Sequence, residues 1–360
     1  MTHDFDSYET QLAAEIAAVE PLDPSFEGEA RTRLDSLTKP PGSLGKLETI
    51  ATHVATVQRS VRPTARRKVV LVMAGDHGVV SEGVSPYPSE VTTQMVANFC
   101  AGGAAINQIA ESVGAEVRIF DVGVGGDLAG CDGPSNRRVA SGTENMAHGP
   151  AMTREQCAQA VLVGIQAARE AAQQGFTLIG TGEMGIGNTT ASAALTAVFT
   201  GADPSEVVGR GTGLGDAALA HKVEVVRRAL EVNRVRELDA LGVLAAVGGL
   251  EIAALAGVVI GTAEESACVV TDGFVSAAAT LAAIALCPAA RGYVFPSHLS
   301  SEPGHRVALA ALGLEPVLEL DMRLGEGTGA ALAMGIIDAA CRVMAGMATF
   351  AEAGVSGRES

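Results

Sequence analysis

Short apolar runs alternate with glycine-rich or polar loops along most of the chain, and in most cases an Ala-rich segment with helical spacing follows each loop. Runs this short and this apolar are typical of strands buried on both faces of a parallel sheet. Strands that alternate with helices predict an α/β fold, here a Rossmann-like parallel six-stranded sheet. The predicted strands are 69–73, 117–120, 176–179, 268–271, 293–295 and 317–320.

The two ends of the chain show a different pattern. Helical spacing extends over roughly the first 60 residues and returns at 330–353, with no strand pattern in either segment. We therefore expect a small helical domain built from both chain ends, residues 1–66 with 336–360. Residues 67–335 would form a large α/β catalytic domain.

Polar side chains gather in the loops that follow the predicted strands. In an open α/β sheet, ligands bind outside the carboxyl ends of the strands, so these loops should converge on one site. This convergence is the strongest argument from pattern alone for an enzyme. The loops are 75–78, 121–124, 182–190, 272–274, 297–305 and 321–329.

The loop at 182–191, with the sequence GEMGIGNTTA, has the features of an anion site between a strand and a helix. Gly182 and Gly187 are spaced as in a P-loop and Thr189 takes the hydroxyl position, but Asn188 replaces the lysine. Without that charge the loop suits a nucleoside monophosphate better than a triphosphate. The alternative is a tight turn in which Asn188 or Thr189 only caps the helix.

Glu326 lies between two glycines after the last predicted strand, in the sequence DMRLGEGTGA at 321–330. The small neighbours leave its carboxylate free to face a ligand, where it could act as a general base. The alternative is a carboxylate that only favours a helix N-terminus through the helix dipole.

A metal site is a weaker hypothesis. His298, Glu302 and His305 offer nitrogen and oxygen ligands, but their spacing matches no H-E-x-x-H pattern. Pro303 and Gly304 would break a helix that could align them. We expect hydrogen bonding to substrate or between loops, with no metal and no cofactor.

Charge and cysteine content restrict the partners and the compartment. The formal net charge of −16 argues against a nucleic acid partner, which requires a basic surface. The six cysteines form no C-x-x-C pair and no apolar signal peptide precedes them, so we expect a cytoplasmic protein. The apolar stretch 240–263 has the length of a membrane span, but Glu251 at its centre predicts packed helices instead, without a membrane partner.

Five segments carry a resemblance to a known family: TKPPGSLG at 38–45, AGDHG at 74–78, EGVSPYPSEVTTQ at 82–94, and the two loops at 182–190 and 321–330. Together and in this order they resemble the nicotinate-nucleotide:dimethylbenzimidazole phosphoribosyltransferase family of cobalamin lower-ligand synthesis. The resemblance implies transfer of the phosphoribosyl group of nicotinate mononucleotide to dimethylbenzimidazole, which gives α-ribazole phosphate and nicotinate. It also implies a homodimer in which the neighbouring subunit helps to close the active site.

The resemblance assigns roles to single residues. Glu326 matches the family's catalytic glutamate and would take the proton of the benzimidazole nitrogen, and Glu183 would favour the positive charge of the ribose in the transition state. Because the pyridinium nitrogen becomes neutral when its bond to ribose breaks, no general acid is needed. Tyr87 and Gln94 are the candidates for the base slot. The candidates for the nucleotide side are Gly185, Gly187, Asn188, Thr189, Gly211 and Lys222.

Two other functions remain open at this point. A P-loop-like nucleotide kinase or ATPase would bind Mg²⁺ with a nucleoside triphosphate, although Asn188 stands where its lysine belongs. A non-catalytic nucleotide sensor would keep the loop but would not need Glu326.

Overall fold

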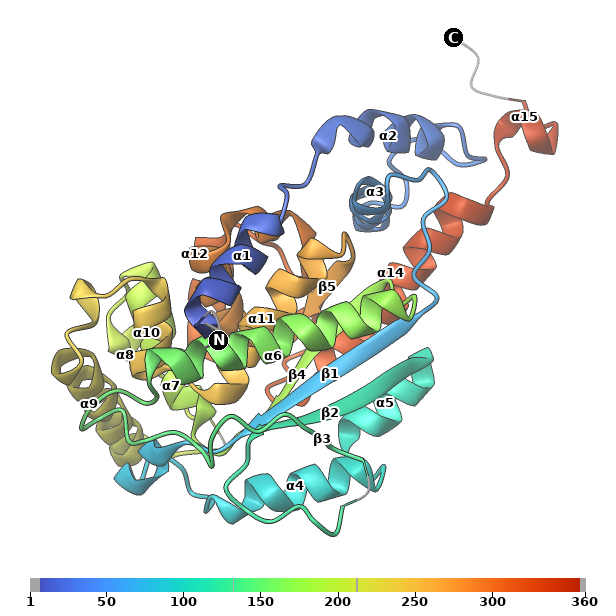
Figure 1. Cartoon of the computed structure of the whole chain (residues 1–360). Helices are drawn as coiled ribbons and strands as arrows, with labels where there is room; N and C mark the ends of the chain where they lie inside the picture. Colours follow the sequence, from blue (N-terminus) through green and yellow to red (C-terminus); the bar gives the residue numbers. More distant parts are fainter. Residues whose placement is uncertain (1–6, 132, 212, 357–360) are drawn as a thin grey trace, which may run out of the picture.

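The computed structural model describes residues 7–131, 133–211 and 213–356 and has one sheet of six parallel strands in the order β3-β2-β1-β4-β5-β6 (Figure 1). The parallel six-stranded α/β fold is thus confirmed. The sheet strands are β1 Lys68–Gly75, β2 Ala115–Gly123, β3 Ser135–Asn136, β4 Leu178–Met184, β5 Cys268–Thr271 and β6 Val294–Pro296.

β1 lies at the centre of the sheet, and all of its residues are buried. It pairs with β2 on one side and β4 on the other, with Lys68 opposite both Ala115 and Leu178. A strand covered on both faces needs apolar side chains at every position, which explains the continuous apolar run at 69–74.

One predicted strand lies outside the main sheet. Residues 317–320 contribute the short strand β8 (Leu318–Glu319), which pairs with β7 (His298–Leu299) in a separate two-stranded sheet, and Leu320 is 53% exposed. The prediction of a sixth buried strand there was wrong. The sixth strand of the sheet is β3 instead. Its two residues, Ser135 and Asn136, are polar, and backbone pairing with β2 keeps this strand at the edge of the sheet.

Helices cover both faces of the sheet. A Cβ added to Gly180 of β4 would meet the side chains of Ala330 and Met334, and one added to Gly182 would meet the Glu326 backbone. A Cβ added to Gly75 of β1 would instead meet Glu251 of α11. Thus the start of α14 lies on one face and α11 on the other. The helices around the sheet are α4 Glu90–Cys100, α5 Ala105–Val113, α6 Arg154–Gln173, α7 Asn188–Thr200, α8 Pro204–Val207, α9 Asp216–Val232, α10 Ala240–Val247, α11 Leu250–Glu264, α12 Phe274–Leu286, α13 Pro303–Leu312 and α14 Thr328–Gly346.

The apolar stretch at 240–263 forms α10 and α11, and α11 is buried from Leu250 to Ala263. α11 packs directly on α6. The two helices approach so closely that a Cβ on Gly164 would lie 1.8 Å from the Ala254 carbonyl oxygen, and one on Gly257 would lie 1.9 Å from that of Val161. Glycine at these positions therefore allows the contact.

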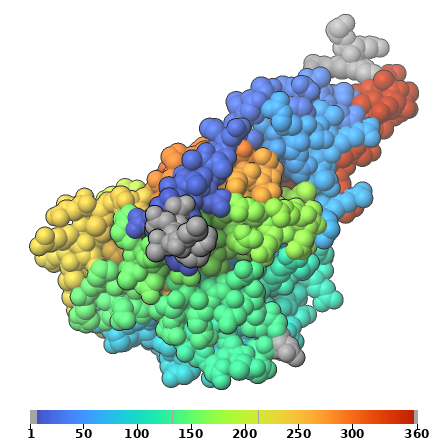
Figure 2. Space-filling view, viewed as in Figure 1, coloured from blue at the N-terminus to red at the C-terminus, as the bar shows by residue number. Residues whose placement is uncertain are grey.

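Helices from the two chain ends meet beside the sheet, where they project as an arm (Figures 1 and 2). α3 packs on α14, and Leu37 forms an antiparallel bridge with Thr349. α1 instead packs on α6, where Glu15 pairs with Arg169 at 2.5 Å. The domain boundaries stay a prediction. These end helices are α1 Tyr8–Ala18, α2 Glu27–Asp35, α3 Lys46–Gln58 and α15 Phe350–Ala353.

Among the described helices, α14 is long and apolar enough to cross a membrane by length and composition. Half of it is buried inside the protein, where it contacts α3, α5 and β4. This is typical of a core helix.

We predict that Gly164→Ala lowers the free energy of unfolding by about 1 to 3 kcal/mol, because the added methyl group cannot fit between α6 and α11. The measurement is the urea midpoint. Gly28→Ala on exposed α2 is the matched control, since no atom lies within 4 Å of the added methyl group, and it should raise stability by about 0.5 to 1 kcal/mol. An unchanged midpoint for Gly164→Ala would contradict the packing argument.

Candidate active site

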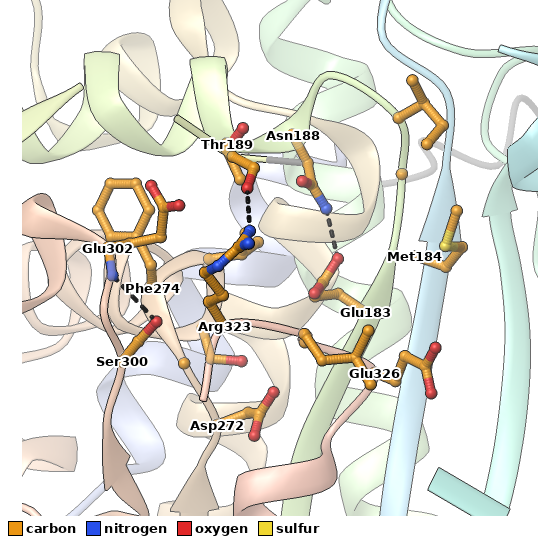
Figure 3. Close-up of a pocket in the computed structure, with 18 of the residues that line it drawn as sticks. Glu183, Met184, Asn188, Thr189, Asp272, Phe274, Ser300, Glu302, Arg323 and Glu326 are labelled. Carbon is orange, nitrogen blue, oxygen red and sulfur yellow. Dashed lines mark hydrogen bonds between the residues drawn. The ribbon is translucent and has the colours of Figure 1, made fainter. Parts of the chain in front are cut away.

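A cleft of about 450 Å³ opens where the chain leaves β4 and β5 (Figure 3). Its walls come from four stretches that follow β4, β5, β6 and β8, with α4 and the segment before it on the remaining side. Four of the six predicted loops thus meet. The lining residues used below are Tyr87, Val91, Met95, Glu183, Met184, Gly185, Asn188, Thr189, Gly211, Asp272, Ser300, Glu302, Arg323, Leu324 and Glu326.

The loop from β4 to α7 is the predicted anion site. Gly187 occupies the helix N-cap at φ +95, and a Cβ on Gly185 would lie 2.5 Å from the Gly75 carbonyl oxygen. The side chains of Asn188 and Thr189 do not cap α7, so the capping alternative does not hold. Asn188 donates to the Glu183 carboxyl group instead.

Thr189 and Gly211 line the cleft, and Lys222 of α9 lies behind them. The Lys222 ammonium donates to the Thr189 hydroxyl at 2.8 Å, and a Cβ on Gly211 would lie 3.4 Å from Lys222 Nζ. Burial lowers the pKa of Lys222 to about 8, although the carboxylate of Glu302 opposes this shift. The structure therefore brings these three predicted nucleotide residues together.

Glu326 sits in a turn of three left-handed residues, with φ of +87, +63 and +96 from Gly325 to Gly327. Its side chain is largely buried, and Oε2 accepts a hydrogen bond from the backbone N–H of Ile106 at 3.2 Å. The carboxylate thus faces the start of α5 and not that of α14, which follows it in sequence. Burial raises the pKa of Glu326, the Asp272 charge adds to this, and the Ile106 N–H opposes it.

Glu183 lies near the end of β4 and close to the same turn, since a Cβ on Gly325 would lie 2.1 Å from its Oε1. Burial, then the charges of Asp272 and Glu251, raise the pKa of Glu183 to about 8. Hydrogen bonds from Asn188 and the backbone N–H of Glu326 only partly offset this. At pH 7 most Glu183 side chains therefore carry a proton.

The two ends of the cleft differ in chemistry. Figure 3 shows Thr189, Ser300, Glu302 and the Phe274 ring toward one side, Met184 and Glu326 toward the other, and Glu183 between them. The hydroxyl groups of Thr189 and Ser300 make the first side suitable for a phosphorylated sugar. The Met184 thioether makes the other side suitable for a flat apolar ring. Further apolar lining residues are Tyr87, Val91, Met95 and Leu324.

Gln94 lies apart from this cleft. It lines a second hollow of about 570 Å³ with Asp76, His77 and Gly125, which follow β1 and β2. Gln94 is one residue before Met95 on α4, so the two side chains point to different sides of the helix. The expectation that all six loops converge on one site is therefore met only in part.

Asp272, Ser300 and Glu302 line the cleft but were not among the predicted site residues. The one signal for Asp272 was its place directly after an apolar strand. Ser300 and Glu302 stood in the segment considered for a metal. There the His305 ring nitrogen Nδ1 accepts from the Ser300 N–H at 2.9 Å, and burial lowers the pKa of His305 to about 3.

Among the described residues, no group of three or more His, Cys, Asp or Glu side chains is arranged to hold a metal ion.

Comparisons with known proteins agree over nearly the whole chain. A family model described as Phosphoribosyltransferase (DBI_PRT) matches residues 19–355. A nicotinate-nucleotide–dimethylbenzimidazole phosphoribosyltransferase from Geobacter sulfurreducens is 51% identical over 96% of this chain and 99% of its own length. One from Desulforamulus reducens is 52% identical over the same shares. The crystal structure of CobT from Thermus thermophilus has a TM-score of 0.89 at 51% identity, over 92% of this chain and 99% of that one.

The buried Glu183 predicts a specific pH dependence of stability. Its pKa rises to about 8 on folding, so the folded chain holds this proton more tightly than the unfolded chain. The resulting stabilisation is complete below the unfolded pKa of about 4.5 and is lost as pH rises through about 8. Between pH 5 and 8.5 the wild type should lose at least about 1 kcal/mol relative to Glu183→Gln, measured by urea unfolding. Parallel curves for the two proteins would show that Glu183 is ionised when folded.

Proposed function

The chain belongs to the nicotinate-nucleotide:dimethylbenzimidazole phosphoribosyltransferase family, and we infer that it is a pentosyltransferase of cobalamin lower-ligand synthesis. It transfers the phosphoribosyl group of nicotinate mononucleotide to dimethylbenzimidazole and gives α-ribazole phosphate and nicotinate. The observation that carries this function is the family match over residues 19–355.

The geometry of the cleft fits the two substrates. The phosphoribosyl group belongs at the polar end, where Thr189 and Gly211 face the cleft and Lys222 supplies positive charge. The flat benzimidazole belongs beside Met184 and Leu324 at the apolar end. Glu183 and Glu326 then lie near the point where the new carbon–nitrogen bond forms.

Glu326 is the general base in this proposal. As the benzimidazole nitrogen attacks the anomeric carbon, the carbon–nitrogen bond to the pyridinium ring breaks and its electron pair returns to the ring nitrogen. Glu326 takes the proton from the attacking ring, so no general acid is required. Its raised pKa brings the carboxylate closer to the pH at which a base accepts a proton most effectively.

Glu183 supports the positive charge that develops on the ribose. In the free chain it is largely protonated at pH 7, because its pKa is about 8. A cationic pyridinium ring nearby favours the ionised form, so donor binding would release this proton. The charge is then present when the transition state forms.

The kinase and sensor alternatives find no support. The side chain that replaces the P-loop lysine, Asn188, donates to Glu183 and presents no charge to a γ-phosphate. The relatives at about half identity carry the name of a transferase.

We further propose a cytoplasmic homodimer without a nucleic acid or membrane partner. Two large apolar side chains that line the cleft stay exposed, Tyr87 at 49% and Leu324 at 57%, and a second subunit would cover them. The six cysteines are free thiols, which favours a reducing compartment. The net charge of −16 disfavours nucleic acid.

The direct test is chromatography of products after the purified protein is mixed with nicotinate mononucleotide and dimethylbenzimidazole. We expect free nicotinate and α-ribazole phosphate in equal amounts, since one donor is used for each product. Omission of dimethylbenzimidazole is the control. Binding of the nucleotide without either product would contradict the proposed reaction.

We predict that Glu326→Gln keeps binding of nicotinate mononucleotide but lowers kcat by about 100-fold or more, because the amide cannot accept the proton. Calorimetric titration and product formation measure the two effects. Glu319→Gln is the matched control, since Glu319 is exposed on β8 and should retain full activity. Substantial activity in Glu326→Gln would show that Glu326 is not the general base.

A further inference from the structure

The backbone of Glu326 adopts a conformation that residues other than glycine rarely adopt. Its φ is +63, and both flanking glycines are also left-handed. For an ordinary residue this costs roughly 1 to 2 kcal/mol relative to a right-handed conformation. Such a conformation persists only where surrounding contacts determine it, and it often marks a functional position.

Asp272 supplies those contacts. It follows β5, and its side chain is 1% exposed. Oδ2 accepts from the Gly327 N–H at 3.2 Å and Oδ1 from the Ala330 N–H at 3.0 Å. The residue at the N-cap of α14 is Gly327, which has no side chain to cap the helix. A carboxylate from a different element therefore holds both the turn and the start of α14.

We propose that Asp272 is a positioning residue for the transfer reaction and acts through Glu326. Its carboxylate holds the left-handed turn in which Glu326 faces the apolar end of the cleft. This inference rests on the proposed function, in which Glu326 is the base. Asp272 itself is committed to the turn, because both of its carboxylate oxygens accept backbone N–H hydrogen bonds.

Asp272 also affects Glu326 through its charge. Its negative charge contributes to the raised pKa of both Glu326 and Glu183. Burial raises the pKa of Asp272 itself, and His298, whose Nδ1 lies 3.9 Å from Oδ1, opposes this shift together with the backbone N–H donors of the turn. Loss of the Asp272 charge should therefore lower the pKa of both glutamates, which a purely structural role would not do.

The experiment measures kcat and KM from pH 5 to 9 for the wild type, Asp272→Asn, Glu326→Gln and the double variant. We expect Asp272→Asn to lower kcat by about 10- to 100-fold, as for a misplaced catalytic group. The KM for nicotinate mononucleotide should change little, and the acidic limb of the kcat profile should move to lower pH. In the Glu326→Gln background the same substitution should lower kcat by far less, because only the effect of the Asp272 charge on Glu183 remains.

Independent losses that multiply in the double variant would overturn the proposal, and so would an acidic limb that stays in place. The wild type and Glu326→Gln test the proposed function separately, because absent transfer or an active Glu326→Gln protein would appear without any change at Asp272. Asp239→Asn is the matched control: Asp239 caps α10 by accepting from Gly242 N–H at 2.8 Å, away from the cleft. It should lower stability without moving the pH profile.

A second variant serves if Asp272→Asn does not fold. The Asp272 N–H donates to the Thr181 hydroxyl at 3.1 Å, so Thr181→Val loosens Asp272 while its charge stays. We expect a smaller loss of kcat with an unmoved acidic limb, and the loss should disappear in the Glu326→Gln background. The same loss in both backgrounds would count against the proposal.

Discussion

Three of the four carboxyl groups that line the cleft, those of Glu183, Asp272 and Glu326, accept hydrogen bonds from the structure around them. Backbone N–H groups at the start of α14 bind Asp272, and the start of α5 provides one for Glu326. The Glu183 carboxyl group accepts hydrogen bonds from the Asn188 side chain and from the backbone N–H of Glu326, and its pKa is still raised. Because a buried charge without such partners is strongly unfavourable, the positions of these helix ends are tied to the chemistry of the cleft.

Close backbone approach then brings Glu183 and Glu326, the two proposed catalytic glutamates, next to each other. A Cβ on Gly182 would lie 2.5 Å from the Glu326 carbonyl oxygen, and one on Gly325 would lie 2.1 Å from Glu183 Oε1. The end of β4 and the turn around Glu326, more than 140 positions apart in the chain, therefore approach closely where both carry glycine. A side chain at either glycine would push Glu183 and Glu326 apart, and small displacements of a catalytic group reduce rates strongly.

The sequence predicted those features that depend on local pattern. The runs at 69–73 and 268–271 became β1 and β5 because burial on both faces demands continuous apolar residues. β3 could not be predicted, because this strand is defined by its pairing with β2 and not by a pattern in its own side chains. The glycines on either side of Glu326 were visible in the sequence, and so was a carboxylate free to face a ligand. The role of Asp272 was not, because it arises from contacts with a segment more than 50 residues away.

The raised pKa values suggest how such a cleft treats a donor whose charge changes during the reaction. A cationic pyridinium ring draws Glu183 toward its ionised form, and the ionised carboxylate then attracts the ring. When the bond to ribose breaks, the ring nitrogen becomes neutral and this attraction ends. The departing nicotinate then carries only its own carboxylate, which the acidic groups repel. The acidic groups at this end of the cleft therefore interact more favourably with the cationic donor than with the leaving group.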